Sequence, residues 1–266
     1  MSKNRGNFKI QPIEENSYIF PLEIDKRIGI VSDTHFGSKY AAYGKLGEFY
    51  DHVDELGIKQ VFHAGDITDG TYDGRLGDLE FVGSADQANK VIRDYPRKKG
   101  VETFVIMGNH DSLYLRRDGV DIMEKIASAR PDLKDCGTYY ARFVDEDRNI
   151  KLDLQHPSSV KTYAISYGAQ SYLRGLPPSQ RPDILIRGHM HQSWFGQNLG
   201  VLVFEAGCFI NPSKHLSDMG YENTVGGWIA QIDSNDRRIK SVKTEWFQGK
   251  AHVTRTANKF KSNTSG

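Results

Sequence analysis

Side chains that can do metal chemistry occur in five short motifs that are widely separated along the chain. They are Asp-Thr-His at 33–35, Gly-Asp at 65–66, Gly-Asn-His-Asp at 108–111, a histidine before proline at 156, and Gly-His-Met-His at 188–191. Carboxylate, amide and imidazole groups suit Mn, Fe, Zn or Ni, and the set contains no thiolate for copper(I) or an iron–sulfur cluster. The donors exceed what one tetrahedral ion needs, whereas two ions about 3.5–4 Å apart would use them all. These residue types therefore predict a two-metal centre that can bind phosphate.

Each motif follows a segment whose composition predicts a β-strand. These segments are Ile28–Ser32, Gln60–His63, Thr103–Ile106, Ile150–Gln155 and Asp183–Ile186. Ligand sites of open α/β sheets assemble at the carboxyl ends of strands, so the recurrence predicts one site built from all five motifs. The glycines beside the polar residues would let the backbone turn sharply and a substrate approach closely.

Between these strands, apolar residues repeat at helical spacing in three segments and predict three helices. They are Leu46–Leu56, Ala88–Tyr95 and Ile122–Ile126, and Gly65–Gly83 is predicted to be a long loop. Further strands are predicted at Tyr139–Val144, Val201–Phe204, Gly227–Ile232 and Ile239–Trp246. Strand–helix–strand units followed mostly by strands predict an α/β sandwich.

The overall composition is that of a globular protein. Among 266 residues, 38% are hydrophobic, which excludes a disordered or collagen-like chain. The 35 basic and 34 acidic side chains nearly cancel, so net charge predicts neither nucleic-acid nor membrane binding. No apolar run approaches the ~20 residues of a membrane helix, no signal peptide is visible, and two cysteines make no disulfide framework. We expect a cytoplasmic protein without a membrane partner, with one domain over residues 1–246 and a flexible basic tail over 247–266.

The five motifs, in this order, resemble those of the calcineurin-like metallophosphoesterases over roughly residues 26–232. The resemblance implies a four-layer αββα sandwich, in which two mixed sheets are flanked by helices. It also implies two divalent metal ions, with Mn expected and Fe, Zn, Ni or Co as alternatives. One ion would be held by Asp33, His35 and His191, the other by Asn109, His156 and His189, and Asp66 would bridge the two. His156 has the weakest support, because a lone histidine before proline is often structural.

The resemblance also assigns two catalytic residues. His110 corresponds to the family's catalytic histidine, which protonates or stabilises the leaving oxygen, and Asp69 to the acid that orients this histidine. Asp73 and Asp78, on the same loop, are rivals for the role of Asp69. Asp111 is expected either to cap the following segment or to support the ligands.

The implied function is a binuclear metal-dependent phosphoesterase in which a metal-bridging hydroxide attacks phosphorus. Protein phosphatases of the family carry arginine after the bridging acid, but Ile67 follows Asp66 here, which argues against protein dephosphorylation. The runs 33–37, 108–113 and 121–123 resemble the nuclease subunit of double-strand-break repair complexes, although this chain is too short for that subunit's additional regions. We therefore expect a phosphodiesterase or nuclease acting on DNA or nucleotides.

Two alternatives remain open, a phosphomonoesterase and a non-catalytic binding or scaffold subunit. The loss of ligands would favour the scaffold, and none of the seven proposed ligands is missing. Oligomeric state is not predicted. Among the other histidines, we expect His63 to pack against the site and assign no role to His52, His215 or His252. Cys208 is expected to be buried, and aromatic residues of the flanking loops could stack on a base, although packing is the default: Phe36, Tyr40, Tyr43, Tyr72 and Tyr114.

Overall fold

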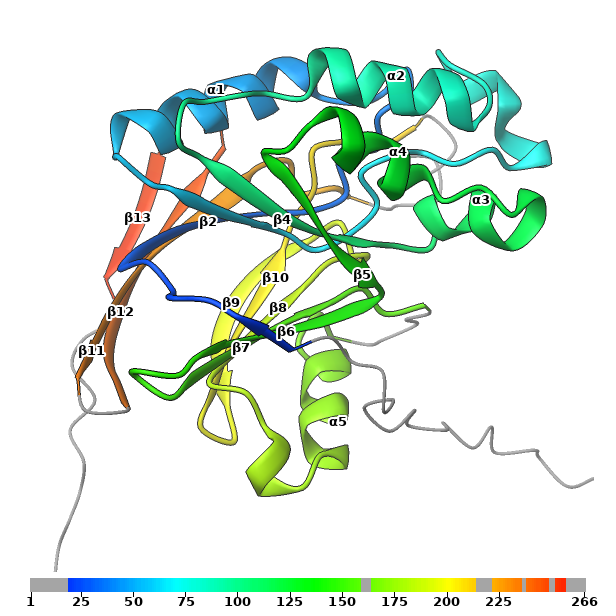
Figure 1. Cartoon of the computed structure of the whole chain (residues 1–266). Helices are drawn as coiled ribbons and strands as arrows, with labels where there is room; N and C mark the ends of the chain where they lie inside the picture. Colours follow the sequence, from blue (N-terminus) through cyan, green and yellow to red (C-terminus); the bar gives the residue numbers. More distant parts are fainter. Residues whose placement is uncertain (1–18, 159–163, 214–221, 236–237, 249–251, 257–266) are drawn as a thin grey trace, which may run out of the picture.

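Two mixed β-sheets form the centre of the molecule (Figure 1). The computed structural model describes residues 19–158, 164–213, 222–235, 238–248 and 252–256. Within these residues, the first sheet consists of β1 (Ile19–Pro21), β6 (Tyr140–Asp145), β7 (Ile150–Gln155), β8 (Ile184–Arg187), β9 (Ser193–Asn198) and β10 (Val201–Ala206). Its strand order is β1-β6-β7-β8-β10-β9, with β7, β8 and β10 parallel to one another.

The second sheet provides most of the strand ends that precede the polar motifs. In the described part of the chain, it consists of β2 (Arg27–Val31), β3 (Gln60–His63), β4 (Glu102–Met107), β5 (Leu133–Thr138), β11 (Gly227–Asn235), β12 (Arg238–Phe247) and β13 (His252–Thr256). The order is β13-β12-β11-β2-β3-β4-β5, parallel from β2 to β5 and antiparallel elsewhere. Because β2, β3 and β4 are parallel neighbours, their carboxyl ends lie at one edge.

Helices cover the outer faces of both sheets (Figure 1). They are α1 (Tyr43–Glu55), α2 (Ser84–Asp94), α3 (Asp111–Asp118), α4 (Ile122–Ala129) and α5 (Tyr167–Gly175), with short 3₁₀ helices η1 (Asp73–Asp78) and η2 (Pro178–Gln180). One apolar cluster joins α1, α2 and α4 to the second sheet, and another joins α5 to the first. The predicted four-layer arrangement of two mixed sheets flanked by helices is confirmed. Among the described residues, no helix has the length and apolar character needed to cross a bilayer.

The alternation of side chains along the strands builds this layering. In β4, Phe104 and Ile106 face the core between the two sheets, whereas Val105 faces the helices. In β8, Ile184 and Ile186 likewise face the inter-sheet core, and Leu185 faces α5. A strand that is buried on both faces reads as an almost continuous apolar run, which is why its sequence was readable as a strand.

Several elements were not predicted, because their sequences lack a clear apolar period. Strand β9 has the sequence SWFGQN and contains no fully buried residue, and α5 has two fully buried residues, Ala169 and Leu173. The same holds for β1, α3 and β5. The predicted loop 65–83 contains η1. In the predicted tail 247–266, Phe247 is the last residue of β12 and His252–Thr256 forms β13 against that strand, whereas residues 249–251 and 257–266 lie outside the described residues.

Candidate metal centre

The five polar motifs meet at one edge of the two sheets. Asp33, Asp66 and Asn109 follow β2, β3 and β4 of the second sheet. His156 follows β7, and His189 and His191 follow β8, in the first sheet. Parallel pairing of β7 with β8 and of β2 with β3 and β4 brings the carboxyl ends together, as the sequence predicted.

The backbone at these positions is mostly left-handed. Among the described residues, eight non-glycine residues have positive φ, and five of them are proposed ligands: Asp33, His35, Asp66, His189 and His191, with φ between 46° and 76°. This region is unfavourable for residues with a Cβ and persists only where the surrounding structure enforces it. The turns need neighbours without side chains, since a Cβ at Gly108 would collide with the Asp66 carboxylate. Such concentrated strain is typical of a functional site.

Asp33, His35 and His191 form the first group of donors. The Asp33 Oδ1 atom lies 3.2 Å from His191 Nε2, and His191 Nε2 lies 3.1 Å from His35 Nε2. Asp33 Oδ2 accepts a hydrogen bond from the His189 backbone N–H, but the fully buried Oδ1 has no hydrogen-bond partner. A buried carboxylate oxygen without a partner, facing two imidazole nitrogens, is the arrangement that a divalent cation would complete.

A second group contains Asp66, Asn109, His156 and His189. His156 Nε2 lies 3.1 Å from both Asp66 Oδ2 and Asn109 Oδ1. Asn109 Oδ1 is also 2.8 Å from His189 Nδ1. Donor atoms of Asp66, His156 and His189 all lie within 4.8 Å of one another, so one ion could contact them together. The oxygen and nitrogen donors of both groups fit a borderline divalent metal.

Neighbouring acceptors orient two of the histidines. His35 Nδ1 lies 2.8 Å from Asp69 Oδ1, and His156 Nδ1 lies 2.7 Å from the Ala64 carbonyl. Each contact places a proton on Nδ1 and directs Nε2 at the donor group, as is usual for histidines that bind metals.

The electrostatics of the site follow from burial and close acid–imidazole contacts. Burial by itself would raise the pKa of Asp33, but His191 and His35 hold that pKa well below its usual range. Burial would lower the pKa of His35, but Asp33 and Asp69 raise it to about 10. In the same way, Asp66 outweighs burial and raises the pKa of His156 to about 9. Asp33 and Asp66 thus stay ionised, and a metal ion that binds at Nε2 of His35 or His156 would displace the proton there.

His110 lies over the Asp66 carboxylate. Its backbone N–H donates to Asp66 Oδ1 at 2.8 Å, and its Nε2 is 4.0 Å from Asp66 Oδ2. Its Nδ1 donates to the backbone carbonyl of Asp69 at 2.5 Å, whereas the Asp69 carboxylate, 3.7 Å away, bonds instead to His35. The expected acid therefore reaches His110 mainly through its backbone. The rivals are engaged elsewhere, Asp73 with Arg117 and Asp78 with Arg75.

Asp111 joins two of the loops that carry donors, a role the sequence left undecided. Its fully buried carboxylate accepts hydrogen bonds from Gly108 N at 2.9 Å, Ile67 N at 3.2 Å and Thr68 N at 2.8 Å. The Thr68 hydroxyl donates a fourth bond at 2.6 Å. Asp111 thereby fixes the loop after β3, which carries Asp66, to the loop after β4. Only its place inside the 108–111 motif gave a signal in the sequence.

The remaining expectations from the sequence concern the other histidines, Cys208 and the flanking aromatic residues. His63 is buried outside the donor groups, with Nε2 3.2 Å from Thr34 Oγ1, and Cys208 is buried, both as predicted. His52 bonds to Glu245 and stacks on Phe247, and His215 lies outside the described residues. Among the flanking aromatics, Phe36 and Tyr114 are buried in the core, Tyr43 packs against that core, and Tyr40 packs beside Cys208, whereas Tyr72 is half-buried with its ring against His110.

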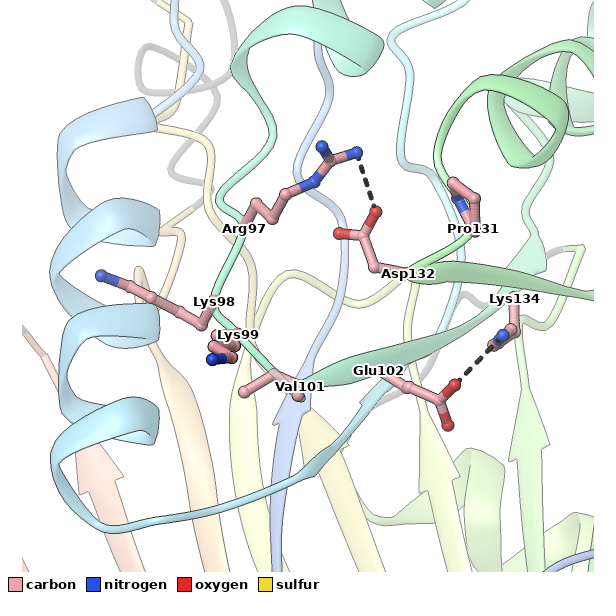
Figure 2. A pocket seen from close by; sticks show the side chains of 9 residues that line it. Arg97, Lys98, Lys99, Val101, Glu102, Pro131, Asp132 and Lys134 are labelled. Carbon is pink, nitrogen blue, oxygen red and sulfur yellow. Dashed lines mark hydrogen bonds and ion pairs between the residues drawn. The ribbon is translucent and has the colours of Figure 1, made fainter.

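A pocket occurs at the opposite end of the second sheet (Figure 2). It is lined by residues around the amino-terminal ends of β4 and β5, whereas the polar motifs follow carboxyl ends. Two of its cations are paired with acids that line it, Arg97 with Asp132 and Lys134 with Glu102. None of the proposed metal ligands lines this pocket.

Comparisons with known proteins agree with this geometry. A family model described as calcineurin-like phosphoesterase matches residues 26–193. Vacuolar protein sorting 29 from Cryptosporidium parvum is similar in structure, at 13% identity and TM-score 0.51, over 89% of this chain and 98% of that one. An archaeal phosphodiesterase is also similar, at 14% identity and TM-score 0.47, over 86% and 99% of the two chains. A comparison with curated protein sequences finds no match. The likeness to vacuolar protein sorting 29 shows the fold.

Proposed function

Because this chain belongs to the calcineurin-like phosphoesterase family, we propose that it is a metal-dependent phosphodiesterase or nuclease acting on nucleic acids or nucleotides. One observation carries the proposal. Seven nitrogen- and oxygen-bearing side chains from five separated motifs converge at one edge of the sheets, five of them with left-handed backbone. A structural role does not require this strained arrangement, whereas a centre with fixed donor positions does.

The donor set supports two divalent ions, with Mn expected. When bound, the ions would activate water for attack on phosphorus and neutralise charge on the phosphate oxygens. The buried, unpartnered Asp33 Oδ1 supports the first position, and the close approach of Asn109 to two imidazoles supports the second. Asp33, His35 and His191 would hold one ion, Asn109, His156 and His189 the other, and Asp66 both.

His110 is the proposed proton donor to the leaving oxygen. With Nδ1 occupied by the Asp69 carbonyl, the other ring nitrogen faces Asp66 and the donor groups. A proton on Nε2 is then directed at a substrate held over the centre. Burial lowers the pKa of His110, which makes its protonated form a stronger acid. The carboxylate of Asp69 meanwhile fixes the ring of His35.

The absence of an arginine after Asp66 favours a diester over a phosphoprotein. Ile67 occupies that position and is fully buried, so this position offers no guanidinium for the terminal oxygens of a monoester. A diester carries one negative charge at phosphorus and depends less on such a group. The alternatives, a phosphomonoesterase or a binding subunit, are outcomes of the test below.

The test measures turnover of the full chain with bis-p-nitrophenyl phosphate, p-nitrophenyl phosphate, single-stranded DNA, duplex DNA and cyclic nucleotides, with Mn²⁺ and with EDTA. We expect metal-dependent hydrolysis of diesters, lost in Asp66→Asn and kept in the control Asp73→Asn on the same loop. His110→Ala should still bind two ions per chain by elemental analysis but turn over about 10²–10⁴ times more slowly. Faster hydrolysis of the monoester would indicate a phosphatase, and no hydrolysis of any ester would favour a binding subunit.

A further inference from the structure

Two adjacent arginines on α3 are held in different ways. Arg117 donates to the Thr71 carbonyl at 2.9 Å and lies 3.7 Å from Asp73 Oδ1. Arg116 makes one long hydrogen bond, from Nη2 to the Asn109 carbonyl at 3.3 Å. In the described part of the chain, no carboxylate lies within 4.0 Å of the Arg116 guanidinium. Arg116 is thus an exposed cation without a counter-charge, bonded to the backbone of a proposed ligand.

The Asn109 carbonyl does not hold Arg116 firmly. It is also approached by the Ser112 hydroxyl at 3.3 Å and the Tyr72 hydroxyl at 3.4 Å. A carbonyl oxygen has two lone pairs, so three donors at these distances compete for it. The Arg116 guanidinium has five N–H groups, and most of them are therefore available to another acceptor.

Tyr72 lies on the same side of the centre. Its ring contacts the ring of His110, with centroids 5.0 Å apart and planes at 67°. Tyr72 is half-buried, so part of its ring remains accessible. Arg117 and Thr71 tie this loop to α3, which fixes Tyr72 and Arg116 next to each other and next to His110.

The Arg116 guanidinium and the Tyr72 ring are groups that bind the phosphates and bases of a nucleic-acid strand. A guanidinium binds phosphate with paired hydrogen bonds, and accessible aromatic rings stack on unpaired bases. Since His110 is the proposed donor to the leaving oxygen, groups beside it face the leaving-group side of the substrate. An ester with only one phosphate has no second anionic group that could bind Arg116.

Resting on the proposed function, we infer that Arg116 and Tyr72 form a subsite for the nucleotide next to the scissile phosphate of a single-stranded nucleic acid. Arg116 binds the phosphate next to the scissile one, and Tyr72 contacts the base or sugar that lies between these two phosphates. Arg116 therefore determines specificity for a strand over a small diester.

The experiment compares kcat/KM for oligothymidylate and for bis-p-nitrophenyl phosphate, which has no second phosphate, in wild type, Arg116→Ala and Arg116→Lys. Arg93→Ala is the matched control, an exposed arginine on α2 bonded to Asp94. We expect Arg116→Ala to lower kcat/KM for oligothymidylate at least tenfold, mainly through KM, and to change the small diester less than twofold. The negative slope of log(kcat/KM) against log[salt] should become shallower by about 0.7 in Arg116→Ala, and Arg116→Lys should restore part of the activity.

Tyr72→Leu tests the aromatic half of the subsite, and we expect a larger loss on oligothymidylate than on the small diester. Equal losses on both substrates in Arg116→Ala, or no loss on either, would overturn the inference and leave the proposed function intact. Faster cleavage of duplex than of single-stranded DNA would overturn it too. Failure of the wild type on every ester would overturn the proposed function itself.

Discussion

Glu205 and Arg187 form a buried ion pair in which only one of the two Glu205 carboxylate oxygens has a partner. Arg187 Nη1 lies 2.8 Å from Glu205 Oε1, but Glu205 Oε2 is buried without a hydrogen-bond partner. Burial raises the pKa of Glu205 from 4.5 to about 7, because the single bond to Arg187 offsets only part of the lost hydration and Asp33 adds negative charge. One bond to arginine does not compensate a carboxylate for full burial.

The raised pKa of Glu205 predicts that the free energy of unfolding depends on pH. The folded protein binds a proton at Glu205 between pH 4.5 and about 7, whereas the unfolded chain does not. The group's contribution is therefore complete below pH 4.5 and is lost as pH rises through 7, by up to about 3 kcal/mol. Glu205→Gln should flatten the fall in the free energy of unfolding, measured by urea denaturation at pH 5 and pH 8. The exposed Glu124→Gln is the control. If the free energy of unfolding of Glu205→Gln falls between pH 5 and pH 8 by as much as that of wild type, the assignment is contradicted.

At the scale of elements, the site depends on how loops are fixed to one another. Strands β3 and β4 deliver Asp66 and Asn109 to one edge, but the loops after them are joined by Asp111. Four donors surround this carboxylate, and two of them, Gly108 N and Ile67 N, meet the same oxygen, Oδ2. A neutral amide cannot satisfy all four, because one of its ends is a donor.

Asp111→Asn should consequently destabilise the fold by about 1–3 kcal/mol, since either orientation of the amide leaves its NH₂ group facing at least one buried N–H, that of Thr68 or those of Gly108 and Ile67. It should also weaken metal binding through the loop after β3. Asp121→Asn provides a matched control, because Asp121 caps α4 through Met123 N and Glu124 N, and asparagine caps helices equally well. Thermal unfolding and Mn²⁺ titration measure both effects. If the two variants lost equal stability, Asp111 would not be the link between the loops.

For the whole molecule, the donors bridge the two sheets. Asp33, Asp66 and Asn109 belong to the second sheet, and His156 and His189 to the first. The core between the sheets is one continuous apolar cluster, so both sheets already pack as a unit. Ions held by both sheets would bind only the folded arrangement.

Mn²⁺ should therefore raise the stability of the whole chain. A ligand at 100 times its Kd adds about 2.7 kcal/mol when it binds only the folded state. We expect the melting temperature to rise by several degrees in Mn²⁺ relative to EDTA, in a single transition. The rise should vanish in Asp66→Asn. An unchanged melting temperature in the wild type at saturating Mn²⁺ would argue against a metal held by both sheets.

The sequence by itself determined the strands that precede the polar motifs, an α/β sandwich and the set of residues that meet at the sheet edge, and its resemblance to a known family implied the four layers. The strands and their meeting point follow from local information, because doubly buried strands read as apolar runs and parallel strands place their carboxyl ends together. Weakly patterned elements such as β9 and α5 escaped prediction, since packing against the rest of the molecule decides their conformation.

Only the tertiary structure decided which neighbour each polar group contacts. The Asp69 carboxylate bonds to His35 and its carbonyl to His110, and Asp111 binds a loop more than 40 residues earlier in the chain. Among the residues that the structure describes, no acid pairs with Arg116. Hydrogen bonds and ion pairs between loops distant in sequence are made or lost by shifts of less than about 1 Å in atomic position, and residue types along the chain do not encode positions so finely.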